Sequence, residues 1–134
     1  MISAITGLMV MLAATVCLAL ARSWQAALYN PGGFREEFHH FRLSKAELSG
    51  VVLMAAVGFL GALPGAALMA WVPLMVAGIA LVHGMVGLKS MSGFWLVGFY
   101  ALLLTTWPTL VIVLLLALID TFADFRSRLA GSQR

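Results

Sequence analysis

Two ionisable side chains beside long apolar runs are the residues most able to do chemistry. His83 is the only ionisable residue between Leu48 and Leu88, and Asp120 directly follows the uncharged run 94–119. If these runs cross a membrane, such side chains are rare and commonly serve ligand binding or proton transfer. We therefore take His83 and Asp120 as candidate ligand-binding residues. The alternatives are a neutral histidine that bonds a neighbouring helix or reaches headgroups, and an acid that forms ion pairs where its helix ends.

The remaining polar patterns predict no catalytic or metal centre. Asp120, Asp124 and Arg128 recur at four-residue intervals, so on one continuous helix they would share a face. His39 and His40 are adjacent, and adjacent residues point to different sides of a helix, so the pair does not predict a metal site. The chain has no phosphate-binding glycine loop, serine elbow, paired-cysteine motif or HExxH. We expect a protein that is not an enzyme and uses no metal or cofactor.

The distribution of charge places these residues in a membrane protein. The 134 residues are 63% hydrophobic and only 10% charged, with a mean hydropathy of +1.04, whereas soluble domains are about 25% charged. Seven of the charged residues lie between Arg22 and Glu47, five between Asp120 and Arg134, and Lys89 is the other. Basic residues beside apolar runs set orientation and contact anionic lipid, so the partner is the lipid bilayer and not a nucleic acid.

The sequence predicts an all-α, polytopic membrane helical bundle, folded as a single domain over 1–134. Runs of about 18 or more apolar residues indicate membrane spans. Four hydrophobic segments are expected, at about 2–21, 48–63, 66–88 and 94–125. Thr105-Thr106-Trp107-Pro108 interrupts the last of them, so one long kinked helix and two shorter helices are both compatible with the pattern.

The segment 22–47 is expected to be a cytoplasmic loop that carries a short amphipathic helix. Asn30, Pro31, Gly32 and Gly33 form a turn motif. Phe34, Phe38 and Phe41 follow at i, i+4 and i+7, with Arg35 and Arg42 among the charges around them. This helix either lies in the membrane surface, where the five residues would contact lipid or a partner, or packs on the spans.

The side of the membrane that holds the C-terminus depends on the last segment. Arg22, Arg35, Arg42 and Lys45 mark the first loop as cytoplasmic by the positive-inside rule. A single last helix would leave Arg126, Arg128 and Arg134 outside, whereas a broken one would return them to the cytoplasm. Both alternatives stay open. Glycines at helical spacing, including Gly58, Gly61 and Gly65, favour close packing within the chain or a homodimer face.

Several of these motifs together resemble a known family. Trp24-Gln25-Ala26-Ala27-Leu28-Tyr29-Asn30-Pro31-Gly32-Gly33-Phe34 leads into Glu37-Phe38 and Phe41-Arg42-Leu43, and further on come Val82-His83-Gly84, Trp95-Leu96-Val97 and Phe99-Tyr100. The chain closes on Asp120-Thr121-Phe122-Ala123-Asp124-Phe125-Arg126. From Trp24 to Arg128 the sequence resembles the C-terminal half of the YybS-like family of uncharacterised bacterial inner-membrane proteins.

The resemblance implies a role in small-molecule binding or transport. That family is distantly similar to the S components of energy-coupling-factor transporters, which are all-helical membrane proteins that capture a small molecule and dock on a transmembrane partner. A bacterial inner-membrane location follows, with a second copy, a separate N-terminal half or a transporter subunit as partner. The alternative function is a non-catalytic membrane assembly or scaffold protein that acts through helix–helix contacts.

Overall fold

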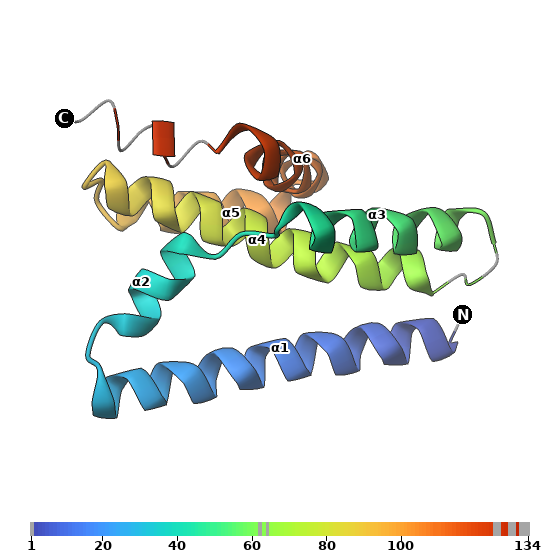
Figure 1. The fold of residues 1–134 in the computed structure, drawn as a ribbon, viewed down its shortest axis with the longest axis horizontal. Helices are drawn as coiled ribbons and strands as arrows, with labels where there is room; N and C mark the ends of the chain where they lie inside the picture. Colours follow the sequence, from blue (N-terminus) through green and yellow to red (C-terminus); the bar gives the residue numbers. More distant parts are fainter. Residues whose placement is uncertain (1, 62, 64, 125–126, 129–130, 132–134) are drawn as a thin grey trace. The chain divides into compact units, whose positions relative to one another are not determined.

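The described part of the chain is mostly α-helical. The computed structural model describes residues 2–61, 63, 65–124, 127–128 and 131. Among these residues there are six α-helices and no strand (Figure 1). They are α1 (Ile2–Tyr29), α2 (Gly33–His40), α3 (Lys45–Phe59), α4 (Ala66–Leu88), α5 (Phe94–Thr105) and α6 (Trp107–Ala123). The chain folds into two compact units, Met1–Glu37 with Ala46–Pro73 and Phe38–Lys45 with Leu74–Arg134.

The first unit packs α1, α3 and the start of α4 through small residues. A Cβ built on Gly65 would lie 2.9 Å from the Cβ of Ala4, and one built on Gly58 would lie 2.7 Å from the Cβ of Ala67. Only small side chains permit such close approach between apolar helices. At the other end of α1, the Arg22 guanidinium binds both carboxylate oxygens of Glu37 on α2, with Nε 2.8 Å from Oε2. Close apolar packing and the bidentate Arg22–Glu37 ion pair therefore stabilise this unit.

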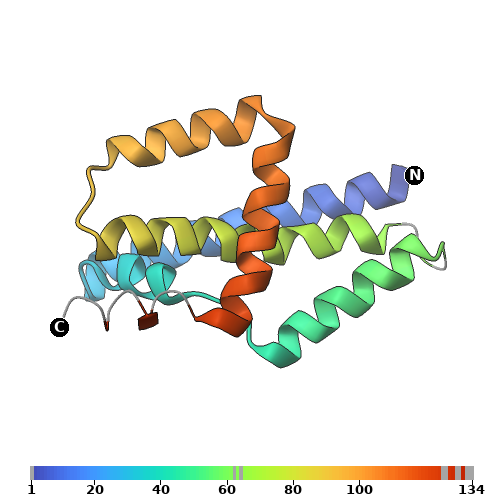
Figure 2. The ribbon, with the colours of Figure 1, turned by 90° about the horizontal axis from the view of Figure 1, so that it is seen from above.

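The second unit packs α6 across the second part of α4. A Cβ built on Gly78 would lie 2.5 Å from Val113 Cγ1 and 2.6 Å from the Val113 carbonyl oxygen, so the two backbones nearly touch there. Val113, Ala117 and Asp120, at i, i+4 and i+7 on α6, are all buried. Figure 2 shows α6 crossing α4 and α5 leading into α6 at a sharp bend.

The structure has fewer helices of spanning length than the four spans predicted. In the described residues, α1 and α4 are long and apolar enough to cross a membrane, and α5 with α6 would add a third if this bent pair is one span. The predicted span 48–63 corresponds to α3, which ends at Phe59 and has 15 residues, fewer than the about 20 that cross the hydrocarbon core without bilayer thinning. The chain turns immediately afterwards, with Gly61 at φ 80°. Apolar turn residues such as Leu60 and Leu63 had lengthened the hydrophobic run without lengthening the helix.

The last hydrophobic segment forms two helices, which is one of the two alternatives compatible with its sequence. The chain bends by 115° between α5 and α6 at Thr106, whose extended backbone (φ −125°, ψ 116°) ends one helix and begins the next. Pro108 lies in the first turn of α6, where its missing N–H costs no hydrogen bond. α6 ends at Ala123, and residue 125, the last of the predicted segment, lies outside the described residues.

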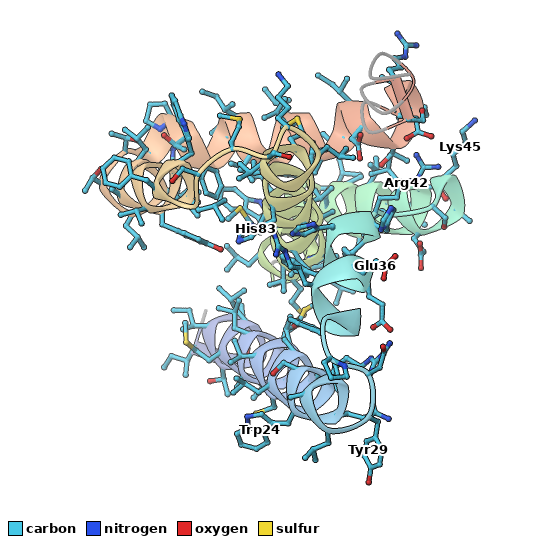
Figure 3. The ribbon with its side chains drawn as sticks, turned by 90° about the vertical axis from the view of Figure 1, so that its left-hand side faces the viewer. Trp24, Tyr29, Glu36, Arg42, Lys45 and His83 are labelled. Carbon is cyan, nitrogen blue, oxygen red and sulfur yellow. The ribbon has the colours of Figure 1, made fainter. Side chains whose placement is uncertain are left out.

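Much of the apolar surface of α1 and α5 faces outward. Large side chains that are exposed include Ile5, Val10, Val16 and Leu20 on α1, and Trp95, Val97 and Leu102 on α5. Trp24 and Tyr29 also point away from α1 near its end (Figure 3). Water-soluble proteins rarely expose apolar surface on this scale. The composition, the two or three sufficiently long helices and this outward apolar surface fit a membrane protein.

Candidate functional site

His83 is held by both of its ring nitrogens. Its Nδ1 lies 3.0 Å from the carbonyl oxygen of Ile79, one turn earlier on α4. A carbonyl can only accept, so Nδ1 carries the hydrogen and Nε2 of the neutral ring is an acceptor. The Tyr100 hydroxyl on α5 lies 3.4 Å from Nε2 and donates to it. The imidazole thus links α4 to α5 through a Tyr100–His83–Ile79 chain.

Aromatic rings surround this polar pair. The Phe38 ring, on the last turn of α2, meets the His83 ring edge-on at a centroid distance of 5.4 Å. The Tyr100 ring lies 5.8 Å from His83 and 5.3 Å from Phe99. Figure 3 labels His83 where α4 meets the end of α2. We call Phe38, His83, Phe99 and Tyr100 the His83 cluster. It offers one acceptor, one hydroxyl and several ring faces to a bound molecule.

A second contact fixes the end of α2 on α4. A Cβ built on Gly87 would lie 2.7 Å from Cε1 and 2.9 Å from Nδ1 of His39. Gly87 is one turn beyond His83 on α4, and His39 follows Phe38 on α2. The last turn of α2 therefore packs on α4 at two successive turns. This contact agrees with the alternative in which the amphipathic helix packs on the spans.

Asp120 lies apart from these residues in the fold, on α6. Its relative exposure is 2%. It shares the buried face of α6 with Val113 and Ala117, which is the face that packs on α4 at Gly78. The neighbouring Thr121 is also buried, and its hydroxyl donates to the Ala117 carbonyl at 3.2 Å. Asp120 is thus a buried acid near the end of an apolar helix.

The expected shared face of Asp120, Asp124 and Arg128 is not formed. Asp124 has φ 46° and ψ 61°, a left-handed conformation that ends α6. Its carboxylate instead accepts a hydrogen bond from Arg42 Nη1 at 2.9 Å. Partial burial opposes ionisation of Asp124, but the bond and charge of Arg42, together with Ser127, outweigh it and lower the pKa of this carboxyl. Arg42 therefore connects the segment after α2 to the end of α6.

The predicted surface helix is shorter than expected. α2 ends at His40, so Phe41 and Arg42 follow the helix and the predicted stripe keeps only Phe34 and Phe38. Phe34 is half-buried and Arg35 is exposed. In the turn before the helix, Gly32 has φ 89° and Gly33 N–H donates to the Asn30 carbonyl at 2.9 Å. Pro31 is the other residue of this turn.

Two side-chain contacts between helices were not predicted from the sequence. Tyr100 had been noted only as part of a motif, although a tyrosine in an apolar helix usually bonds its hydroxyl to a partner. The Arg22–Glu37 pair was also missed, and Arg22 lowers the pKa of the Glu37 carboxyl through its hydrogen bonds. These partners lie on different helices, so no spacing rule joins them.

The comparisons with known proteins give no similar protein from which a function could be inferred. No protein-family model, no curated protein and no solved structure matches the chain. Within the described part of the chain, no group of three or more His, Cys, Asp or Glu side chains is placed to hold a metal ion. The function must therefore be argued from the His83 cluster and the helices that position it.

Proposed function

We propose that this chain is a multi-pass protein of a bacterial inner membrane that binds a small molecule as part of a transport system, in the manner of an S component. The observation that carries the proposal is the His83–Tyr100 pair, a polar contact between two strongly apolar helices. Polar side chains are costly in such helices and tend to be kept for function. The resemblance to the C-terminal half of the YybS-like family supports the same role.

The geometry of the cluster supports binding in preference to catalysis. The Tyr100 ring is exposed, so a molecule can reach the hydroxyl, whereas the Nδ1 side of His83 is occupied by Ile79. A bound molecule could replace Tyr100 as the donor to Nε2 and stack on Phe38 or Phe99. Small-molecule sites commonly combine apolar walls with a few orienting polar groups. Buried Asp120 would brace α6 against α4, away from the ligand.

The test is native mass spectrometry of the full chain, extracted gently from the membranes of its own host. A bound small molecule or a co-purifying transporter subunit supports the proposal. His83→Ala removes the acceptor and should lose the small molecule, whereas Tyr100→Phe removes only the donor that the ligand replaces and should retain it. Tyr29→Phe, a matched change on an exposed tyrosine of α1, should also retain it. If no small molecule or transporter subunit is recovered with the unchanged chain, or if His83→Ala retains the molecule, the proposal is wrong.

The second function, membrane assembly, is favoured by a different observation. The exposed apolar side chains of α1 and α5 offer a surface to other membrane helices as well as to lipid. A bare homodimer, or a complex with unrelated membrane proteins, would support assembly over ligand binding. In that case alanine changes at Phe34, Phe38 and Phe41 should weaken the complex more than changes at His83 or Asp120.

A further inference from the structure

The bend between α5 and α6 allows two paths through a membrane. The pair either crosses once with a bend, or enters and leaves by the same face. A crossing helix needs about 20 residues, whereas α5 has 12 and α6 has 17. At 1.5 Å per residue, the two helices are about 18 and about 26 Å long. The chain direction bends by 115° between them, and these lengths and this bend alone do not select one path.

Contacts of the segment 38–42 select between them. Phe38 and His39 pack on α4 at His83 and Gly87, close to the end of α4. The chain then needs only residues 89–93 to reach the start of α5. Three residues after His39, Arg42 binds Asp124 at the end of α6. The segment 38–42 therefore contacts both the end of α4, which is followed by α5, and Asp124 at the end of α6.

The reach of this segment is too short to span a membrane. Three residues of extended chain cover at most about 11 Å, whereas the hydrocarbon core is about 30 Å thick. Even with the side chains of His39 and Arg42 added at either end, the end of α6 must lie on the face where α4 ends. We propose that α5 and α6 form a re-entrant pair, which enters the bilayer after Gly93, turns at Thr106 and leaves at Asp124 by the same face.

The turn at Thr106 would be the deepest point of the re-entrant pair, and its backbone groups are hydrogen-bonded within the protein. Backbone N–H and C=O groups that lose their helical partners inside a bilayer need other hydrogen-bond partners in the protein. The Thr106 N–H donates to the Leu102 carbonyl at 2.9 Å, and the Thr105 and Thr106 hydroxyls donate to the Ala101 and Leu102 carbonyls at 2.6 Å each. The Thr106 carbonyl in turn accepts from Thr109 N–H at 3.2 Å. The break is thus compatible with membrane depth.

The re-entrant path has two consequences. It places Arg42, Lys89 and Arg128 on one face, in agreement with the positive-inside rule. It also puts the His83 cluster near that face, because His83 precedes the end of α4 by five residues and Tyr100 follows the start of α5 by six. At 1.5 Å per residue, both side chains lie about 8–9 Å of helix from it. The proposed ligand would therefore be reached from the Arg42 side.

The inference rests on the membrane placement in the proposed function, and cysteine labelling tests it. Single cysteines are introduced into the full chain after Cys17→Ala removes its only cysteine. Gly93→Cys and Gly131→Cys report the two ends of the pair, since a Cβ at either meets nothing within 4 Å. Exposed Arg35 and Leu60, changed to cysteine, are the references for the two faces. A membrane-impermeant maleimide is applied to sealed vesicles of known orientation, before and after permeabilisation.

The re-entrant pair predicts that the cysteines at 93 and 131 label from the same face as that at 35 and opposite to that at 60. Labelling of 131 together with 60 would mean a single bent span and would overturn the inference. Carbonate extraction separates the two proposals. A chain released by carbonate contradicts the membrane placement itself, whereas a retained chain with its two ends on opposite faces contradicts only the re-entrant path.

Discussion

The Tyr100 hydroxyl donates to Nε2 of His83 across 3.4 Å, while Nδ1 of the same ring donates to the Ile79 carbonyl. The imidazole is thereby fixed in one tautomer and joins two helices that are otherwise apolar. A long hydrogen bond of this kind contributes little to stability but orients the ring. The pair is therefore suited to exchange one partner for a ligand while the other bond holds the histidine in place.

Tyr100→Phe should weaken the contact between α4 and α5 only slightly. The change removes the donor to Nε2 and keeps the ring that packs on Phe99. Side-chain hydrogen bonds between membrane helices average about 0.6 kcal/mol, so we expect a loss of that order in reversible unfolding in detergent. Tyr29→Phe, on an exposed ring of α1, is the matched control and should leave the unfolding free energy unchanged. A loss above about 2 kcal/mol would show that the bond is a major structural element.

Gly78→Ala should destabilise the second unit because α4 and α6 have no room for a methyl group there. The added Cβ would lie 2.6 Å from the Val113 carbonyl oxygen, which is backbone and cannot rotate away. Overpacking of this kind costs about 1–3 kcal/mol. Gly98→Ala on α5 is the control, since its Cβ meets nothing within 4 Å, and alanine favours a helix over glycine by about 1 kcal/mol. Thermal unfolding of both variants in the same detergent checks the opposite signs, and equal effects would contradict the close packing.

The sequence identified the apolar helices better than it identified their ends. The run 2–21 lies within α1 and the run 66–88 matches α4, because the absence of charge and a helix coincide there. At 48–63 they do not coincide, because hydropathy does not distinguish an apolar turn from an apolar helix. α1 also continues past Arg22 to Tyr29. The charge of Arg22 does not end the helix, because Glu37 binds its guanidinium group.

The candidate site was predicted in part. His83 and Asp120 could be singled out because an ionisable residue in or beside an apolar run is conspicuous in any sequence. Tyr100 could not be assigned as the partner of His83, because the contact depends on how α5 folds back along α4. Arg42 and Asp124 were both noted, but their pairing depends on a left-handed residue that ends α6. Tertiary partners of this kind are set by packing and leave no periodic pattern.

Acid should weaken the first unit through Glu37. Arg22 holds the pKa of the Glu37 carboxyl below its ordinary value of about 4.3. A lowered folded-state pKa means that the pair stabilises the protein fully above the unfolded value and loses this contribution as the pH falls through the folded one. Glu37→Gln and Arg22→Gln should therefore flatten the dependence of unfolding free energy on pH below about pH 5. Glu36→Gln, which leaves the Arg22–Glu37 pair intact, should retain the dependence, and an identical flattening there would assign the effect to another group.

Thr106→Ala should loosen the bend between α5 and α6 without unfolding either helix. The change removes a hydroxyl that lies 2.6 Å from the Leu102 carbonyl and 2.5 Å from the Thr109 hydroxyl. Because the backbone bond from Thr106 N–H to Leu102 remains, we expect a loss of about 0.5–1.5 kcal/mol and faster amide hydrogen exchange confined to residues around the bend. Thr6→Ala is the matched control, since its hydroxyl also donates one turn back, to the Ile2 carbonyl at 3.0 Å, but lies in the first turns of α1. If Thr106→Ala leaves exchange at the bend unchanged, the hydroxyls do not hold the break, and the extended backbone with Pro108 alone accounts for it.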